Sequence, residues 1–179
     1  MTVSMRFFST RWTSEECVLL NLTQQQQIFD LLPDLRDATV LDIGCGIGRL
    51  SGPLSERAAS VFGIDICDTM LLKAKEGFNK PNLQFVKSSA ESLPFNDQMF
   101  DVIIAIFVLQ HILDDVRFTS ALHEMVRVLK PGGSILIVDG ISQQKYRPTT
   151  SQVTIVRTPE DYAPLKQRCV LAFSQEVLQ

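Results

Sequence analysis

The chain has 179 residues, of which 45% are hydrophobic, and this is enough for one domain with a well-packed core. Its net charge of -3 gives no strong attraction to nucleic acid, and no apolar run is long enough to span a membrane, so neither partner is expected. The four cysteines show neither the spacing of a metal site nor that of a small disulfide framework. We therefore predict reduced thiols, no metal and a cytoplasmic location.

The first predicted element is a helix in the N-terminal segment, residues 1–37. Thr13 or Ser14 is a suitable N-cap, because acidic residues occupy the turn that follows. Apolar side chains recur from Val18 onwards, and Pro33 cannot continue a helix. The helix is therefore expected to end near Leu32.

The most informative stretch lies at residues 39–59, where an apolar run enters a glycine-rich turn. Residues 39–43 predict a buried strand, and residues 51–59 have the composition of a helix. Between them glycine stands at every second position, as Gly44, Gly46 and Gly48. A strand, a tight glycine turn and a helix begin a nucleotide-binding α/β unit. The dinucleotide fingerprint G-x-G-x-x-G would need a glycine at position 49, where this chain has Arg49.

A second strand is predicted from Ser60 to Ile64, and Asp65 follows it directly. A carboxylate at this point of a nucleotide-binding unit can accept hydrogen bonds from both ribose hydroxyls. Asp65 alone does not separate NAD from other adenosine-containing cofactors. Asp68 is the expected cap of the next helix.

Strands and helices continue to alternate as far as position 139. Further strands are predicted at residues 83–86, from Phe100 towards His111, and at residues 134–139. Asp114 and Asp115 open a helix that ends in a turn at residues 130–133. Its outer face is expected to carry His123, Glu124, Arg127 and Lys130.

These motifs resemble those of class I S-adenosylmethionine-dependent methyltransferases, whose first motif reads V-L-D-x-G-C-G-x-G. The segment 122–139 is similar to the family's R-V-L-K-P-G-G-x-L-x-I-x-D. The resemblance covers roughly residues 38–178 and is nearest to small-molecule enzymes such as the ubiquinone/menaquinone and sterol groups. It implies a doubly wound, Rossmann-like α/β fold, with a mostly parallel sheet and helices on both faces. It also implies a cofactor-binding domain at residues 38–179, preceded by a covering helix within residues 1–37.

The resemblance implies S-adenosylmethionine as cofactor and S-adenosylhomocysteine as product. Asp65 would bind the ribose and Ile66 would lie against the adenine. Ser89 stands where the family commonly has an acid for the adenine amino group, and Ala90 can still contribute its backbone N–H. A backbone carbonyl at Ile106, followed by Phe107, would hold the methionyl amine. The full set of cofactor-binding residues implied is Asp42, Gly44, Cys45, Gly46, Gly48, Asp65, Ile66, Ser89, Ala90, Ile106 and Phe107.

The implied activity is transfer of a methyl group to a small-molecule acceptor. His111 is a candidate general base, because imidazole titrates near neutral pH, and the alternative is that it only braces the turn. The chain has no N-P-P-Y or D-P-P-Y motif and no Pro-Cys pair, which disfavours adenine, glutamine and cytosine C5 as acceptors.

Two other functions remain open. One is a noncatalytic cofactor-binding or scaffold protein of the same fold, or a shortened methyltransferase. The other is an NAD-dependent dehydrogenase, which Arg49 and the absence of a Tyr-x-x-x-Lys pair at Tyr146 disfavour.

The C-terminal part of the chain gives weaker signals. Residues 141–158 predict a loop, Pro159 suits the first position of a helix, and residues 169–177 predict a sixth strand. No sequence then remains for the family's last, antiparallel strand between the fifth and sixth. An uncovered sheet edge would favour a homodimer.

Overall fold

The computed structural model describes residues 23–140, 142–146, 154–165 and 170–171. The chain divides into two compact units, residues 1–33 and 34–179. In the first unit residues 23–29 are helical, within the helix predicted from the sequence. The predicted start of that helix at Thr13 or Ser14 lies outside the described residues.

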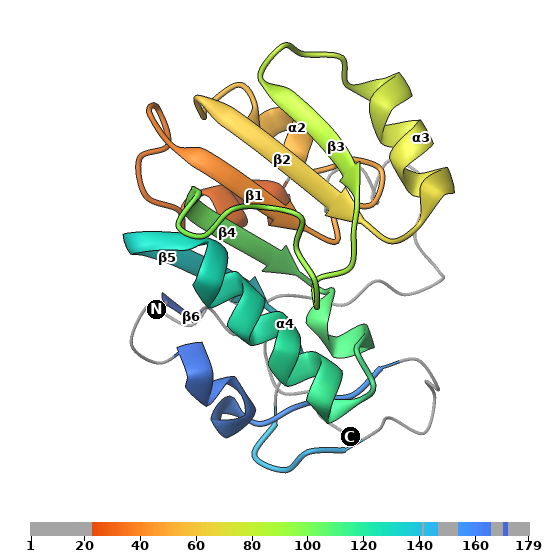
Figure 1. Ribbon diagram of the computed structural model, residues 1–179, viewed down its shortest axis with the longest axis vertical. Helices are drawn as coiled ribbons and strands as arrows, with labels where there is room; N and C mark the ends of the chain where they lie inside the picture. Colours follow the sequence, from red (N-terminus) through yellow and green to blue (C-terminus); the bar gives the residue numbers. More distant parts are fainter. Residues whose placement is uncertain (1–22, 141, 147–153, 166–169, 172–179) are drawn as a thin grey trace. The chain divides into compact units, whose positions relative to one another are not determined.

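The second unit is built on one parallel sheet (Figure 1). Its strands in chain order are β1 (Thr39–Ile43), β2 (Ser60–Asp65), β3 (Leu83–Lys87), β4 (Phe100–Ile106), β5 (Leu129–Val138) and β6 (Val170–Leu171). Their spatial order is β3-β2-β1-β4-β5-β6, and every pairing between these strands is parallel. The order reverses between β1 and β4, so the predicted doubly wound fold is confirmed. In such a sheet ligands bind where the order reverses, beyond the carboxyl ends of the strands.

Within the described residues of this unit, five helical segments accompany the strands. They are α2 (Ser51–Leu54), α3 (Asp68–Gly77), η1 (Leu109–His111), α4 (Asp115–Val128) and η2 (Pro159–Leu165), of which η1 and η2 are 3-10 helices. Asp114 is the N-cap residue of α4, and its side chain accepts from Arg117 N at 2.9 Å. The expected cap at Asp68 is wrong: Cys67 is the N-cap residue, and the Asp68 carboxylate pairs with Lys87.

The strand register explains how the two faces of the sheet are covered. Leu41 lies beside Ile103, and Ile103 beside Ile135, so these side chains share one face. They belong to the core that includes the buried side of α4, which crosses that face in Figure 1. Asp42 and Gly63 lie side by side on the opposite face, towards α2. Full burial of each large apolar side chain contributes about 1.5–3 kcal/mol, so this layered core supports the edge that carries the site.

The β5 strand begins earlier than predicted. The sequence predicted a turn at residues 130–133 and a strand from Ser134, whereas β5 runs from Leu129 to Val138. The turn residues form an irregularity within the strand: Phe100 pairs with Leu129, but Val102 pairs with Ser134. Gly132 supplies the positive φ of +81° that this bulge needs.

The described end of the sheet is β6, which pairs parallel with β5. It comprises Val170 and Leu171, within the predicted sixth strand at 169–177, and the other residues of that prediction lie outside the described part. Over the described ranges no strand pairs antiparallel to β5. None of the helices described is both long enough and apolar enough to cross a bilayer.

Candidate cofactor site

A cavity of about 360 Å³ opens at the carboxyl ends of the first four strands. Each strand contributes the residues at its end or in the loop that follows it. The lining residues are Ile43, Gly44, Ile64, Asp65, Ile66, residues 88–91, Val108, residues 111–114 and Arg117. Six of the site residues predicted from the sequence therefore line this one cavity: Gly44, Asp65, Ile66, Ser89, Ala90 and His111.

The glycine turn after β1 has the backbone that only glycine adopts readily. Gly44, Gly46 and Gly48 have φ values of +70°, +54° and +81°. A Cβ on Gly44 would lie 2.3 Å from Val108 Cγ2, so the turn and the loop after β4 are packed too closely for a side chain. A Cβ on Gly46 would meet nothing within 4 Å, so backbone faces open space at the centre of the turn.

Asp65 holds this turn against the start of α3. One carboxylate oxygen accepts from Gly46 N at 2.9 Å, and the other accepts from Cys67 N at 2.9 Å. The side chain also lines the cavity. Since an ionised carboxylate has about four acceptor positions, two remain for hydroxyl donors in the cavity. The neighbouring Ile66 is 70% exposed, so a large apolar side chain is available beside it for a flat, apolar ring.

Asp42 and Cys45 lie beneath the cavity lining. Asp42 is buried on the face opposite α4 and accepts from Ser51 Oγ at 2.5 Å. Burial raises its pKa to about 7, against the opposing effects of the Ser51 hydrogen bond and the Arg49 charge. Burial also raises the pKa of the Cys45 thiol, so that side chain is a neutral part of the core. Gly48 belongs to this supporting layer too, because a Cβ there would lie 2.9 Å from the Phe85 ring.

The loop after β3 forms another side of the cavity. The Ser89 hydroxyl accepts from Glu91 N at 3.4 Å, which closes a local turn. Glu91 also lines the cavity, and its carboxylate accepts from Arg117 Nε at 2.9 Å. The rim here is therefore an ion pair between this loop and α4, a contact that the sequence did not predict.

Two residues of α4 hold the continuation of this loop. Arg127 donates to the carbonyls of Phe95 and Leu93 at 2.8 and 3.0 Å. Glu124 accepts from Leu93 N at 2.7 Å and pairs with Arg127. The prediction that both lie on the outer face of the helix is wrong, because each is partly covered by this loop. Their three-residue spacing identifies neighbours on a helix, but only the fold shows what they bind.

The end of β4 brings in the remaining predicted residues. Ile106 is the last residue of the strand, and Phe107 has a positive φ of +57°, which is uncommon for a non-glycine residue. Phe107 N donates to Val138 O at 2.6 Å, and this bond holds the chain where it leaves the sheet. Neither residue is part of the cavity lining, whereas Val108 and the exposed His111 are.

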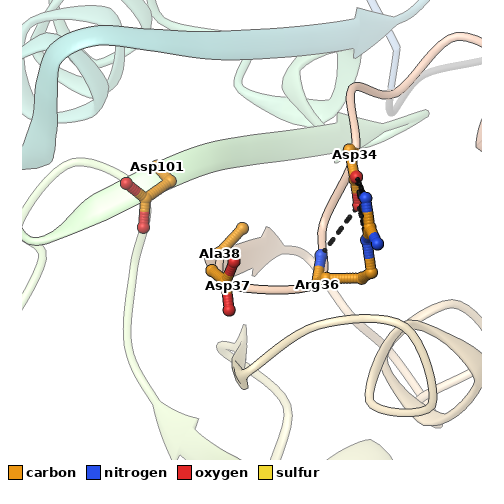
Figure 2. Close-up of a pocket in the computed structure, with 5 residues that line it drawn as sticks. All are labelled: Asp34, Arg36, Asp37, Ala38 and Asp101. Carbon is orange, nitrogen blue, oxygen red and sulfur yellow. Dashed lines mark hydrogen bonds and ion pairs between the residues drawn. The ribbon is translucent and has the colours of Figure 1, made fainter.

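A second hollow, of about 340 Å³, lies at the opposite, amino ends of β1 and β4 (Figure 2). Its lining residues are Asp34, Arg36, Asp37, Ala38 and Asp101. Arg36 pairs with Asp34 and lowers the pKa of that carboxyl to about 2. Asp101 pairs with Lys130 at 2.8 Å and accepts from Thr39 N at 2.9 Å. Asp101 thus links the start of β1 to β5. Among the described residues no cluster of His, Cys, Asp or Glu is suited to a metal ion.

The comparisons with known proteins agree with this geometry. Residues 41–137 match the methyltransferase domain family. The chain belongs to the class I S-adenosylmethionine-dependent methyltransferases. It is similar to the ubiquinone/menaquinone biosynthesis C-methyltransferase UbiE of Idiomarina loihiensis, with 39% identity over 58% of this chain and 43% of the relative. It is also similar to phosphoethanolamine N-methyltransferase 1 of Triticum aestivum, with 29% identity over 84% of this chain and 31% of the relative.

A solved structure of this fold contains the cofactor product. Phosphoethanolamine N-methyltransferase 1 of Haemonchus contortus, in complex with phosphoethanolamine and S-adenosylhomocysteine, superposes with a TM-score of 0.63 at 24% identity. The aligned region covers 75% of this chain and 28% of that one. This methyltransferase chain thus spans less than half the length of the curated relatives above.

The cavity of this methyltransferase fits the cofactor of its family. Its volume of about 360 Å³ lies within the range of roughly 300–1,000 Å³ found for small-molecule sites. Asp65 has acceptor positions left for ribose hydroxyls, Ile66 offers an apolar surface for a ring, and Gly46 leaves space for close approach.

Proposed function

We propose that this chain transfers a methyl group from S-adenosylmethionine to a small-molecule acceptor, as the family to which it belongs does. The observation that carries the proposal is the position of Asp65. Its carboxylate ties the glycine turn to α3 and at the same time faces a cavity at the point where the strand order reverses. Ribose binding needs an acceptor at this place.

The chemistry requires few reactive side chains. When bound, the cofactor supplies an already activated methyl group on its sulfonium. The protein then has to bind both molecules, align the acceptor atom and exclude water. Alignment alone can supply roughly 7–11 kcal/mol of the barrier. His111 lines the cavity, so it is placed to take a proton from an acceptor that must lose one.

The acceptor is proposed to be a small molecule. One relative is named as a C-methyltransferase of ubiquinone/menaquinone biosynthesis, and another as an N-methyltransferase of phosphoethanolamine. Both names point to small molecules as acceptors. The cavity extends past His111 to a charged rim formed by Asp114, Arg117 and Glu91. This rim suits the polar part of an acceptor or of the cofactor. A homodimer through the β6 edge is a further prediction of the sequence.

A noncatalytic cofactor-binding protein of the same fold is the alternative. Ser89 supports it, because a hydroxyl replaces the acid that the family commonly uses for the adenine amino group. A neutral acceptor gives a weaker hydrogen bond than a charged one. Turnover with a panel of small acceptors separates the two functions.

The first test is calorimetric titration of S-adenosylhomocysteine into the chain and into Asp65→Ala, with Asp68→Ala as matched control. Asp68 is an exposed acid three residues away that does not line the cavity. Removing a charged hydrogen-bond acceptor costs about 1.5–3 kcal/mol, so Asp65→Ala should weaken binding at least about tenfold. Asp68→Ala should bind as the parent does.

Asp65→Ala also removes the acceptor of two backbone N–H groups, so its folding must be checked by circular dichroism. Asp65→Asn keeps one of the two acceptor oxygens and serves as a milder variant. NADH is titrated in parallel. Saturable binding of NADH in place of S-adenosylhomocysteine, or no binding by a folded chain, would contradict the proposal.

A further inference from the structure

Arg157 is the most completely buried charged side chain among the described residues. It lies in the segment after β5 that the sequence predicted as a loop, and it belongs to none of the motifs of the cofactor site. A buried cation is costly unless its donors are satisfied, so the contacts of this side chain indicate what it stabilises.

The side-chain contacts of Arg157 lead to the loop between β4 and α4 and to the first turn of α4 itself. Its two terminal nitrogens donate to Leu109 O at 3.3 Å and to Ile112 O at 2.5 Å, the carbonyls on either side of the η1 turn. The guanidinium lies 3.7 Å from the centre of the Phe118 ring, on the buried face of α4. Asp115, at the start of α4, is its ionic partner at 3.5 Å.

The backbone of the two residues before Arg157 adds to this attachment. Ile155 N donates to Gln110 O at 2.8 Å, so three carbonyls of the loop, those of residues 109, 110 and 112, accept from one short segment. The segment is itself held at Tyr146 and Val156, which exchange two backbone hydrogen bonds. It therefore acts as a clamp on the outside of the loop.

The inner side of the same loop lines the cofactor cavity. Val108, His111, Ile112 and Leu113 all contribute to that wall. The loop also follows directly on Ile106 and Phe107, the residues that the sequence predicts for the methionyl end of the cofactor. A change in the position of η1 would therefore change the wall at that end, while Asp65 and Ile66, at the end of β2 and separated from β4 by β1, would keep their places.

We propose that Arg157 is a positioning residue, which fixes the β4–α4 loop and so shapes the methionyl end of the cofactor cavity. The inference rests on the proposed function of this cavity. Arginine is suited to the task because its planar group donates in two directions and stacks on an aromatic ring at the same time. Lysine at this position would keep the charge, but its single nitrogen could not bind the carbonyls of Leu109 and Ile112 in the same way.

The test compares S-adenosylhomocysteine with 5′-methylthioadenosine, which has the same nucleoside but lacks the amino acid part. Both are titrated calorimetrically into the full chain, Arg157→Gln and Arg157→Lys. Arg157→Gln should weaken binding of S-adenosylhomocysteine about tenfold or more and change that of 5′-methylthioadenosine less than about twofold. Arg157→Lys should give an intermediate loss for S-adenosylhomocysteine.

A second readout does not depend on affinity. Amide hydrogen exchange should become faster at His111 and Ile112 in Arg157→Gln, because their N–H groups close the η1 turn with Val108 O and Leu109 O. Val128→Ala is the control, since it removes a fully buried side chain from the far end of α4. It should lower the stability of the fold without discriminating between the two ligands.

The outcomes separate this inference from the proposed function. If the parent chain binds neither ligand, the proposed function fails. If the parent binds both ligands and Arg157→Gln binds both unchanged or loses both equally, the positioning role is refuted. Should Arg157→Gln not fold, Arg157→Lys decides, and an unchanged ratio of the two affinities together with unchanged exchange at η1 would also refute it.

Discussion

Asp42→Asn tests whether the first motif contains a buried acid that limits stability at neutral pH. The carboxyl is 3% exposed, and burial raises its pKa from 3.8 to about 7. Asparagine has nearly the same shape, still accepts the hydrogen bond from Ser51, and has no proton to lose. The substitution therefore removes the titration and keeps the packing.

The sign follows from the raised pKa. The folded state binds the proton more tightly than the unfolded state, so the contribution of Asp42 to stability is fully present below pH 3.8 and is lost as the pH rises to about 7. Each pH unit in this window is worth about 1.4 kcal/mol, so the stability of Asp42→Asn relative to the parent should rise by about 2–3 kcal/mol between pH 5 and pH 8. The attraction between the Asp42 carboxylate and the Arg49 charge is already contained in this pKa, so any offset that remains between protonated Asp42 and asparagine does not change with pH.

The measurement is the free energy of unfolding in urea, followed by circular dichroism at pH 5, 6, 7 and 8 for both proteins. When the two free energies of unfolding are subtracted at each pH, the contributions of the other titrating groups cancel. Asp139 has the same properties, with burial raising its pKa to about 7, so Asp139→Asn should give a similar pH-dependent gain. A difference between the parent and Asp42→Asn that stays constant from pH 5 to pH 8 would refute the reasoning.

Two further substitutions test the close packing of the glycine turn and the attachment of the loop after β3 to α4. Gly44→Ala should weaken S-adenosylhomocysteine binding at least about tenfold, because the new Cβ would lie 2.3 Å from a methyl group of Val108 at a φ of +70°. Adding Val108→Ala should recover part of the lost affinity. No recovery would show that backbone strain, and not the contact with Val108, causes the loss. Arg127→Met should lower the free energy of unfolding by about 1–3 kcal/mol, because the carbonyls of Leu93 and Phe95 lose their donor. Urea unfolding checks this, and an unchanged midpoint would contradict it.

Much of the candidate cofactor site was predictable because its local signals agree with one another. An apolar run, a glycine at every second position and an acid after the next strand each have a local physical cause, and parallel strands bring such ends together. The cavity contains Gly44, Asp65, Ile66, Ser89 and Ala90 for this reason. The predicted cap at Asp68 failed because α3 starts at this residue: Cys67 is the N-cap residue, and Asp68 lies in the first turn, where it pairs with Lys87.

The sequence by itself determined the order of strands and helices, the glycine turn with its positive φ angles, and the acid at the end of β2. These depend on residues close together in the chain, whose backbone preferences and periodicity are visible in one dimension. Only the tertiary structure decided what Glu124, Arg127 and Arg157 do, since their partners lie about 30 to 48 residues away. A charged residue on a polar segment looks the same in sequence whether it faces water or a buried carbonyl, because the carbonyl belongs to the backbone and leaves no mark on the sequence.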